Sequence, residues 1–473
     1  DVAIIGAGSG GLSARREVAK VTDNYVVIDD GPLGTTCARV GCMPSKVLIQ
    51  AANDYHRRNS FKELGIQGSE NLIIDHAKVM THVRKLRDRF VRGVTSSIDK
   101  WKDDHLIQKR ATFIDQNTLD LGDEKIQFKK IIIATGSSPV IPEPWKEYQD
   151  FLIDTDSFFE LEELPKKIAV IGLGVIGIEL GQALHRLGVD VVGIGRSNTI
   201  SGVSDPKIKE YVAEKFSEEM NLDFTGVKSL SKKDNQLIIK TSTQEYIVDK
   251  ALVSVGRSPN ITKLGLENFV KKIDEKGIPL FNEMNFQLLD HPHIAIAGDV
   301  NAVAPILHEA ADQGAVAGHL IANEKAEYDF CRRTPIGITF CSPNIAYVGK
   351  KYQQLKDEGI DFEAGEVSYE GQGRAIVMLS EKGMLRVYGE KGTNKLLGAE
   401  LFAPSGEHLA HLLSWAISSD KTVQQILSYP FYHPVIEEGL RTALRSLSKK
   451  LNGNRNSLEL ARCSEHPTNN CNS

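Results

Sequence analysis

The stretch VAIIGAGSGG (residues 2–11) decides the fold of the N-terminal part of the chain. Four apolar residues lead into a GxGxxG pattern, which is typical of the tight turn between a parallel strand and a helix that binds a dinucleotide pyrophosphate. The next apolar run, residues 25–28, ends at an acid, where a carboxylate can hold ribose hydroxyls. We therefore expect a dinucleotide site formed by Gly6, Gly8, Gly11 and Asp29.

A second copy of this pattern, AVIGLGVIG, occupies residues 169–177. Its three glycines are Gly172, Gly174 and Gly177. Two copies in a strand-turn-helix context favour nucleotide binding over plain tight turns. The strand expected at residues 189–194 is followed by Gly195 and Arg196 instead of an acid. An acid here favours NAD, whereas an arginine can accommodate the 2'-phosphate of NADP, so both nicotinamides stay open.

Length and composition narrow the class of protein. The 473 residues suggest about three domains and exclude one small module. With 57 Lys and Arg against 62 Asp and Glu, the net charge of -5 gives no broad electrostatic reason to expect nucleic acid binding. The longest apolar stretch, residues 168–178, is much shorter than the roughly 20 residues that a membrane-spanning helix needs. We therefore expect neither nucleic acid nor membrane partners.

Apolar periodicity indicates how the chain is organised. Residues 77–100 have the spacing of a long amphipathic helix, and residues 127–133 have that of a strand that leads into ATGSSP (residues 134–139). Residues 235–255 alternate like a small β-meander and close at VGRSPN (residues 255–260). The predicted parts are a first nucleotide-binding domain (residues 1–148), a second one (149–265), a return to the first (266–333), an α+β domain (334–450) and a loose polar tail (451–473).

Two of the six cysteines form a CxxxxC spacing, Cys37 and Cys42. Residues five apart in a helix have Cα atoms roughly 8.7 Å apart, whereas a disulfide needs less than about 7 Å. A bridge therefore requires a backbone that is not yet helical, which Gly41 allows and Pro44, at home in a first helical turn, supports. Cys42 would then lie near a helix N-terminus, where a thiolate is favoured. A redox-active disulfide is the functional interpretation, and two unpaired core cysteines are the alternative.

The C-terminal segment HPVIEE (residues 433–438) contains a candidate proton acceptor. Because a proline disfavours helix at the residue before it and suits the first helical turn, His433 should stand just outside a helix that carries Glu438. A carboxylate can orient the imidazole, and a neutral imidazole can take a proton from a thiol near neutral pH. Taken alone, His433 is better explained as a surface or capping histidine, and Glu437 is a second candidate carboxylate.

Taken in order, these motifs make residues 2–447 resemble the flavin-dependent pyridine nucleotide-disulfide oxidoreductases of class I, and among them the dihydrolipoamide dehydrogenases most closely. The series also includes IAGDV at residues 296–300. The resemblance implies an α/β fold with two Rossmann-like domains, one for FAD and one for NAD or NADP, followed by an α+β dimerisation domain. It implies a homodimer whose substrate is a small dithiol or disulfide.

The resemblance also implies roles for individual residues. Cys42 should face the flavin and Cys37 should exchange with substrate, while Lys46 should lie by the flavin ring and pair with Glu179. His433 and Glu438 should act on the partner subunit's disulfide. The remaining cofactor contacts implied by the resemblance are Asp299 at the flavin's ribityl or pyrophosphate region, and Thr36, Ala111, Thr135, Gly136, Gly256, His308 and Arg196.

The substrate is identified less directly. His308, in PILHEAADQG, resembles the lipoamide dehydrogenase pattern, which favours lipoamide and suggests a 2-oxo acid dehydrogenase complex as the larger assembly. Mercuric reductases end in adjacent cysteines, whereas Cys463 and Cys471 are eight residues apart in a polar tail. An NADPH-dependent reductase of another disulfide or electrophile and a non-catalytic flavin protein stay open. The few cysteines, and an N-terminus that already reads as a strand, lead us to expect the cytoplasm.

Overall fold

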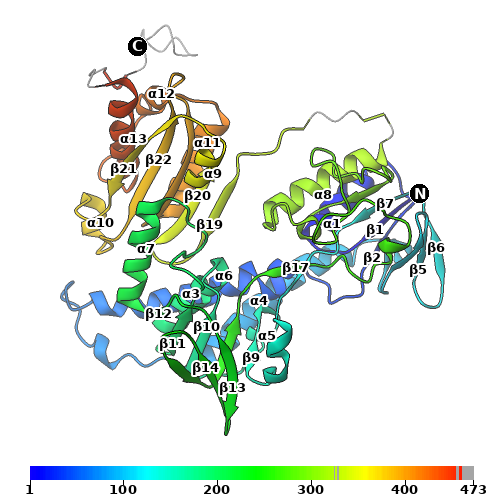
Figure 1. Ribbon diagram of the computed structural model, residues 1–473, viewed down its shortest axis with the longest axis horizontal. Coiled ribbons are helices and arrows are strands. Elements are labelled where there is room, and N and C mark those ends of the chain that lie inside the picture. Colours follow the sequence, from blue (N-terminus) through cyan, green and yellow to red (C-terminus); the bar gives the residue numbers. More distant parts are fainter. Residues whose placement is uncertain (324, 327–329, 454–457, 461–473) are drawn as a thin grey trace.

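Three five-stranded sheets organise the chain in the computed structural model (Figure 1). The structure describes residues 1–323, 325–326, 330–453 and 458–460. Two of the sheets are parallel and the third is antiparallel, which confirms the predicted α/β class with an α+β C-terminal part. The expectations for Cys463 and Cys471, and for most of the tail, lie outside the described residues. No helix in the described part is long and apolar enough to span a membrane.

The first parallel sheet is built around the strand that the GxGxxG pattern predicts. Its strand order is β18-β7-β1-β2-β3, and its two edge strands lie far apart in the sequence. The strand bounds are β1 (Val2–Ile5), β2 (Tyr25–Ile28), β3 (Leu106–Ile107), β7 (Lys130–Ile133) and β18 (Ile294–Ile296). Helices α1 (Ser9–Val18) and α8 (Leu307–Ala322) pack closely together beside it. The chain therefore returns to complete this sheet after the second nucleotide-binding unit.

One strand prediction in this region is wrong in part. Residues 127–133 form two elements, because β6 (Lys125–Gln127) pairs with β5 (Thr118–Asp120) in an antiparallel sheet that also contains β4 (Thr112–Asp115). Only β7 joins the parallel sheet. Both parts are apolar and extended, so local periodicity does not indicate the change of partner between them.

The second parallel sheet repeats the first in design, with strand order β12-β11-β10-β16-β9. Its strands are β9 (Leu152–Ile153), β10 (Lys167–Ile171), β11 (Asp190–Ile194), β12 (Asn221–Asp223) and β16 (Lys250–Val253). Its helices include α6 (Val175–Arg186) and α7 (Pro206–Glu219). The meander is β13 (Ser229–Lys233), β14 (Gln236–Lys240) and β15 (Glu245–Val248), so it begins earlier than predicted, and residues 250–253 belong to the parallel sheet instead.

The segments ATGSSP (residues 134–139) and VGRSPN (residues 255–260) lie side by side as the two crossovers between the nucleotide-binding units. Strand β8 (Ser137–Pro139), from ATGSSP, pairs antiparallel with β17 (Arg257–Pro259), from VGRSPN. The Arg257 guanidinium donates to the Ser137 carbonyl at 2.6 Å, which fastens the outgoing chain to the returning one. The two nucleotide-binding units are thus joined by a paired double connection.

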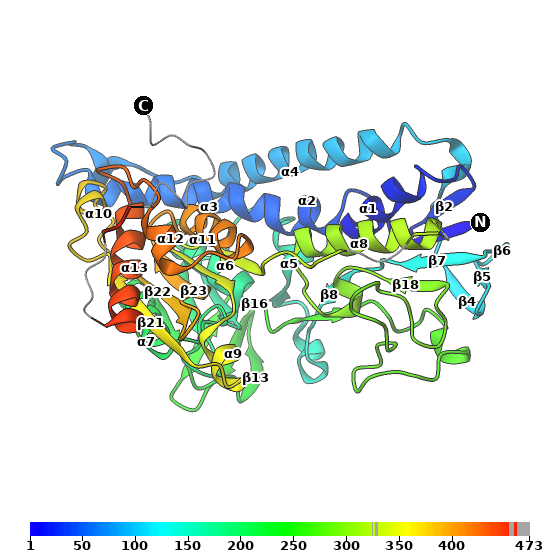
Figure 2. The ribbon, with the colours of Figure 1, turned by 90° about the horizontal axis from the view of Figure 1, so that it is seen from above.

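Two long helices lie beside each other along the outside of the molecule (Figure 2). They are α3 (Cys42–His56) and α4 (His76–Ile98). The helix predicted at residues 77–100 is confirmed to within two residues at each end. The buried residues of α4 include Met80 and Val83, as expected from the amphipathic spacing.

The C-terminal domain is an antiparallel sheet with strand order β19-β20-β23-β22-β21. Its strands are β19 (Ile336–Thr339), β20 (Asn344–Gly349), β21 (Phe362–Ser368), β22 (Met384–Glu390) and β23 (Leu396–Ala403). Its helices are α9 (Tyr352–Asp357), α10 (Gly373–Val377), α11 (Gly406–Ser418), α12 (Val423–Leu427) and α13 (Glu437–Asn452). Helices α11 and α13 pack on the strands and enclose a separate apolar core.

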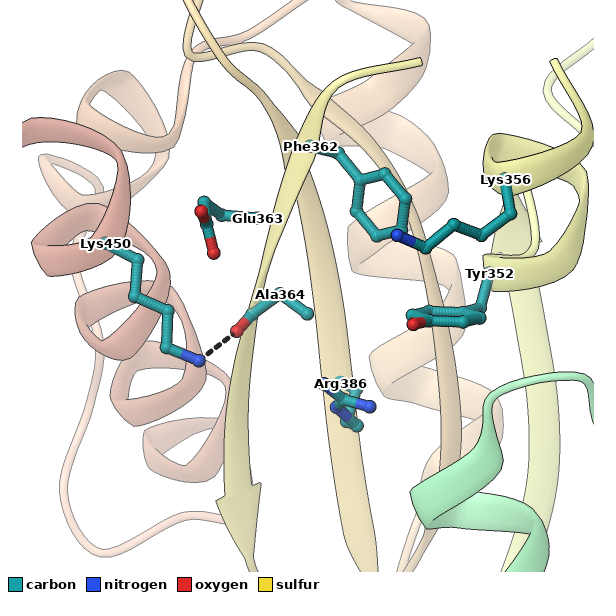
Figure 3. Close-up of a pocket in the computed structure, with 7 residues that line it drawn as sticks. All are labelled: Tyr352, Lys356, Phe362, Glu363, Ala364, Arg386 and Lys450. Carbon is teal, nitrogen blue, oxygen red and sulfur yellow. Dashed lines mark hydrogen bonds between the residues drawn. The ribbon is translucent and has the colours of Figure 1, made fainter. Parts of the chain in front are cut away.

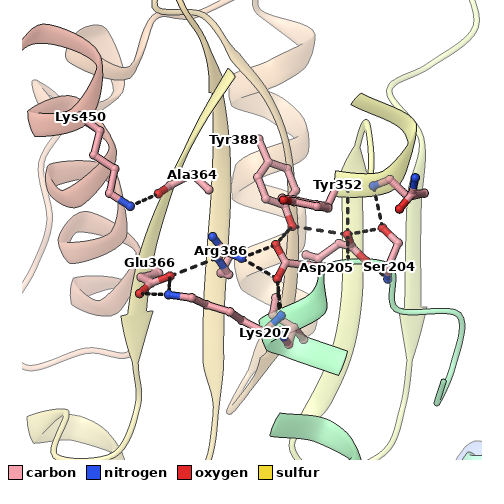
Figure 4. A network of polar contacts seen from close by, with 12 residues as sticks. Ser204, Asp205, Lys207, Tyr352, Ala364, Glu366, Arg386, Tyr388 and Lys450 are labelled. Carbon is pink, nitrogen blue, oxygen red and sulfur yellow. Dashed lines mark hydrogen bonds and ion pairs between the residues drawn. The ribbon is translucent and has the colours of Figure 1, made fainter. Parts of the chain in front are cut away.

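A buried polar network docks the second nucleotide-binding unit on this antiparallel sheet (Figure 4). Asp205, which caps α7 and is fully buried, accepts hydrogen bonds from Arg386 Nη1 at 2.7 and 2.8 Å and from the Tyr388 hydroxyl at 3.0 Å. Glu400, also buried, accepts from the backbone and the hydroxyl of Ser204 at 2.6 and 2.7 Å. Because a buried charge is tolerated only when it is paired, these contacts fix how the two parts meet.

Replacing Arg386 with methionine should lower the free energy of unfolding by about 3 kcal/mol, because Asp205 would stay buried without its cation. Urea denaturation measures this loss. Lys207→Met is the matched control, since it removes an exposed ion pair with Glu366 at 2.8 Å that is worth less than about 1 kcal/mol. Equal losses in the two variants would contradict the importance of burial at this junction.

Candidate active site

The two cysteines of the CxxxxC motif lie on either side of a break between two helices. Cys37 belongs to the short helix α2 (Thr36–Val40), and Cys42 is the first residue of α3. The break is confined to Gly41, with φ -129° and ψ -119°. The expectation of a non-helical backbone at the pair is therefore wrong for Cys37 and holds only at the glycine. One non-helical residue is enough to bring the two free thiols within hydrogen-bonding reach of each other.

The hydrogen bond between the two thiols shifts their pKa values in opposite directions. It is the main cause that lowers the pKa of Cys42 to about 7; the nearby Lys46 ammonium contributes to this lowering, and burial opposes it. The same hydrogen bond, together with burial, raises the pKa of Cys37 well above its usual value. Near neutral pH the negative charge therefore resides on Cys42, at the N-terminus of α3, where the helix dipole also favours an anion.

Lys46 and Glu179 form an ion pair beside the cysteines, although 133 residues separate them. Lys46 lies one turn after Cys42 on α3, and its Nζ is 2.8 Å from Oε2 and 3.0 Å from Oε1 of Glu179 on α6. The carboxylate is almost fully buried. The structure thus brings together the two residues that the family resemblance pairs, next to the more acidic thiol.

The first glycine loop has the shape that a dinucleotide pyrophosphate needs. A Cβ at Gly6 would clash with the backbone of Ala134, and one at Gly11 would clash with Gly6. At Gly8, by contrast, nothing lies within 4 Å of that position, and no side chain caps the N-terminus of α1. The loop therefore presents free backbone N–H groups on an open side, as anion binding at a helix N-terminus requires. These residues fit FAD.

Asp29, the acid expected to contact the ribose, is hydrogen-bonded to the backbone around the first glycine loop. Asp29 accepts from the backbone of Ala7 at 2.6 Å and of Gly31 at 2.7 Å. Asp299 accepts from the Ser137 hydroxyl at 2.9 Å, within the paired crossovers. These carboxylates hold the loops around the first site in place, and their contact with a ribose or ribityl group remains a prediction.

The other residues assigned to the first cofactor lie at the crossovers, beside the thiols, on α8 and in the apolar core. Thr135 and Gly136 are hydrogen-bonded to Asn260 in the returning crossover, at 2.7 and 2.9 Å. Thr36 is exposed beside Cys37, and His308 is half-buried at the second residue of α8. Ala111 is buried in the core of the first sheet. The structure brings Thr36 to the thiols, whereas it places Ala111 among apolar side chains.

The second glycine loop has the same construction, with crowding at Gly172 and Gly177 and open space at Gly174. It differs where the next strand ends. A Cβ at Gly195 would lie 3.0 Å from Leu173 Cδ1 and 3.1 Å from the Ser197 carbonyl, so an acidic side chain would be crowded there. The next residue, Arg196, is exposed. Gly256, in the crossover beyond β16, has φ +133° with open space at its Cβ position.

His433 and Glu438 contact each other as the local sequence predicts. His433 Nδ1 lies 3.0 and 3.1 Å from the two carboxylate oxygens of Glu438, which also accept from the backbone of Val435 at 3.2 Å. The hydrogen bond from the imidazole lowers the pKa of the Glu438 carboxyl. The imidazole is 79% exposed, and within the described part of one chain no contact joins it to Cys37 or Cys42.

Sequence reasoning missed two groups that hold the site together. The backbone N–H of Phe340 donates to Glu179 at 2.8 Å, and Arg257 fastens the crossovers through Ser137. Arg257 stands inside the motif VGRSPN, so its position could have been noticed. Phe340 carries no local signal, because its partner is 161 residues away.

A cavity of about 220 Å³ lies away from this site, on the antiparallel sheet between α9 and the edge strand β21 (Figure 3). Arg386, Lys356 and Lys450 contribute to its wall, and Lys450 donates to the Ala364 carbonyl at 2.5 Å. None of the predicted site residues lines this cavity. This cavity is therefore separate from the candidate active site.

Comparison with known proteins agrees with this geometry. Residues 1–314 match the model of a family described as pyridine nucleotide-disulphide oxidoreductase, and residues 336–444 match its dimerisation domain. The dihydrolipoyl dehydrogenase of Bacillus subtilis (strain 168) is 29% identical over 449 residues, which cover 93% of this chain and 94% of that protein. The mercuric reductase of Staphylococcus aureus is 31% identical over 465 residues, 95% of this chain and 82% of that one.

A solved structure supports the fold. The HOCl-induced flavoprotein disulfide reductase RclA from Escherichia coli superposes with a TM-score of 0.81, covering 94% of this chain and 99% of that one at 20% identity. At this level of identity the likeness concerns the fold alone. The family match thus includes a dimerisation domain, and the solved structure shares the fold of almost the whole chain.

Alkylation of Cys42 should follow a titration with a midpoint near pH 7, because only the thiolate reacts and its pKa is lowered to about 7. Iodoacetamide labelling of the reduced protein, quantified at Cys42 by mass spectrometry, measures the midpoint. Lys46→Met should raise it by about one unit, since a nearby positive charge favours the thiolate. Lys78→Met, an exposed lysine on α4, is the control. An unchanged midpoint in Lys46→Met would contradict the electrostatic role of Lys46.

Proposed function

The chain belongs to the pyridine nucleotide-disulphide oxidoreductase family, which uses FAD and NAD(P), and we propose that it oxidises dihydrolipoamide through Cys37 and Cys42. The observation that carries this proposal is a pair of thiols, one with a lowered and one with a raised pKa, beside the Lys46–Glu179 ion pair. The choice of lipoamide is supported by His308 and by the similarity to dihydrolipoyl dehydrogenases over 93% of the chain. A 2-oxo acid dehydrogenase complex would then supply the lipoyl group, which stays a prediction.

The chemistry at the thiols is an exchange that balances in two steps. A substrate thiolate attacks Cys37 of the oxidised Cys37–Cys42 disulfide, the bond between the two cysteines breaks, and Cys42 leaves as a thiolate. The second substrate thiol then displaces Cys37, so that the substrate becomes a disulfide and the protein holds the electron pair. The lowered pKa of Cys42 makes it the better leaving group near neutral pH.

FAD and a nicotinamide, when bound at the two glycine loops, would supply the two-electron and hydride chemistry that carries the electron pair onward. The residues of this chain orient and stabilise the groups around them. The Lys46 ammonium compensates the negative charge on Cys42, and the open backbone N–H groups at the two glycine loops hold the dinucleotide phosphates. His433, oriented by Glu438, accepts the proton of the substrate thiol at its free nitrogen.

This role for His433 requires a second subunit. Its imidazole is exposed and has no contact with the cysteines within the described part of one chain. The domain that carries it matches a dimerisation domain and exposes large apolar side chains, among them Tyr432 at 81% and Trp415 at 65%. Because such side chains are usually covered in an assembly, they support a homodimer in which His433 serves the partner's disulfide.

A second candidate function is an NADPH-dependent reductase of another disulfide or electrophile. The similarity to a mercuric reductase over 95% of the chain favours it, as do Gly195 and Arg196 at the second site. Among the described residues, no group of three or more histidine, cysteine or acidic side chains could hold a metal ion. A flavin protein without turnover is a third possibility, against which the paired thiols and the oriented His433 argue.

Steady-state oxidation of dihydrolipoamide by the purified holoprotein, with NAD and NADP in parallel, tests the function. We expect turnover, with a preference for NADP, because an acidic side chain would be crowded at Gly195 and the exposed Arg196 next to it can pair with a 2'-phosphate. Arg196→Leu should raise KM for NADP about tenfold through loss of a charge-assisted contact to the 2'-phosphate, with little change for NAD. Lys232→Leu, which changes an exposed lysine on β13 of the meander, is the control.

Two results of this assay would contradict the proposal. Absence of turnover with either nicotinamide, in a protein that binds flavin and has reducible thiols, would favour another substrate. Full turnover by Cys42→Ser would exclude the thiol exchange, since that variant should keep its flavin and lose the oxidation of dihydrolipoamide.

Mixed dimers test whether the site is shared between subunits. The variants Cys37→Ser and His433→Ala should each be nearly inactive alone. Random mixing of equal amounts should restore about a quarter of wild-type turnover, because half of the dimers are mixed and each contains one complete site. Activity that stays at the level of the separate variants would show that His433 acts within its own chain.

A further inference from the structure

We propose that Phe340 is a positioning residue, which holds the Lys46–Glu179 ion pair in place beside Cys42. This inference rests on the proposed function and concerns the same site. It assigns to the dimerisation domain a part in the chemistry of the thiols within its own chain, in addition to the part proposed for His433 in the partner. Phe340 follows β19 of the antiparallel sheet, whereas Lys46 and Glu179 come from α3 and α6.

Phe340 contacts both members of the ion pair. Its backbone N–H donates to Glu179 Oε1 at 2.8 Å, and the same oxygen lies 3.0 Å from Lys46 Nζ. The Lys46 ammonium also lies 4.6 Å from the centre of the Phe340 ring, within the range of a cation–π interaction. One residue therefore fixes the carboxylate through its backbone and the ammonium through its side chain.

Glu179 depends on these contacts because it is buried away from water. The Glu179 carboxylate is 4% exposed, so it depends on donors from the protein, and the Phe340 N–H is one of them. Lys46 is 31% exposed and ends a flexible four-carbon chain that could turn toward solvent. The ring of Phe340 and the carboxylate together limit the positions that the ammonium can take.

The segment that carries Phe340 is itself fixed to α6. Ser342, two residues on, donates to Gln182 Oε1 at 2.8 Å and accepts from Gln182 Nε2 at 3.0 Å and from Arg186 Nη2 at 2.8 Å. Arg186 is buried and paired with Glu219 at 2.6 Å. Because Gln182 and Arg186 lie on the same helix as Glu179, the backbone that carries the ring is fixed relative to the carboxylate.

The position of the ammonium matters to the thiol. Lys46 favours the thiolate of Cys42, whereas Glu179 opposes it. The balance between them depends on how close the ammonium stays to Cys42 when it also contacts the carboxylate. Without the ring, the ammonium gains freedom to move into solvent, and the thiolate becomes less favoured. A ring that only fills space would have no such effect through Lys46.

A double-mutant cycle separates these two roles. The Cys37→Ser holoprotein is the parent, because only Cys42 of the pair is then labelled, and the pH midpoint of iodoacetamide labelling at Cys42 is the readout. Phe340→Leu should raise the midpoint by about 0.5 unit, which is about a threefold loss of labelling rate at pH values below it. Phe340→Tyr, which keeps the ring, should retain the parent's midpoint. In a Lys46→Met background, Phe340→Leu should produce no further shift.

Phe362→Leu is the matched control, because its ring lies 5.0 Å from Lys356 Nζ on the same domain and away from the thiols. It should leave the midpoint unchanged. The proposal is overturned by an unchanged midpoint in Phe340→Leu, or by a shift of equal size with and without Lys46. Since labelling needs no turnover, these outcomes are distinct from a failure to oxidise dihydrolipoamide, which would count against the proposed function alone.

Discussion

The buried carboxylate of Glu179 is the constraint on which the rest of the site depends. It is held by Lys46, by the Phe340 backbone and by the close packing of α3 on α6. These groups belong to three different parts of the chain, so the set of contacts around the carboxylate is complete only when all three are docked. The charge that stabilises the Cys42 thiolate is thereby coupled to the tertiary assembly as a whole.

Buried charges held by partners also define the junction between α7 and the antiparallel sheet. Asp205, Arg386 and Glu400 are buried between α7 and the antiparallel sheet, and each charge is satisfied by hydrogen bonds from the opposite side. An unpaired charge in such a place costs several kcal/mol, which disfavours any other docking of the two parts. This junction contributes no residue to the thiol site, and it fixes the second nucleotide-binding unit on the antiparallel sheet.

The two glycine loops show how one local design serves two ligands. Both have a crowded first and third glycine and an open second one. They differ at the end of the following strand, where Asp29 is hydrogen-bonded to its own loop and Gly195 is packed against Leu173. The chain is similar along more than nine-tenths of its length both to a dihydrolipoyl dehydrogenase and to a mercuric reductase, so overall similarity does not identify the substrate.

The sequence alone determined the features that depend on neighbours along the chain. The GxGxxG turns, the α4 periodicity and the His433–Glu438 contact follow from backbone sterics and side-chain spacing within a few residues. The pairing of Lys46 with Glu179 came only from the family resemblance. Tertiary structure decided what depends on distant partners: the separation of β6 from β7, the helical turn at Cys37 with its break at Gly41, and the contact of Phe340 with Glu179 across 161 residues. The reason is physical, because such contacts are selected by the packing and burial of whole elements, which leave no period or spacing in the local sequence.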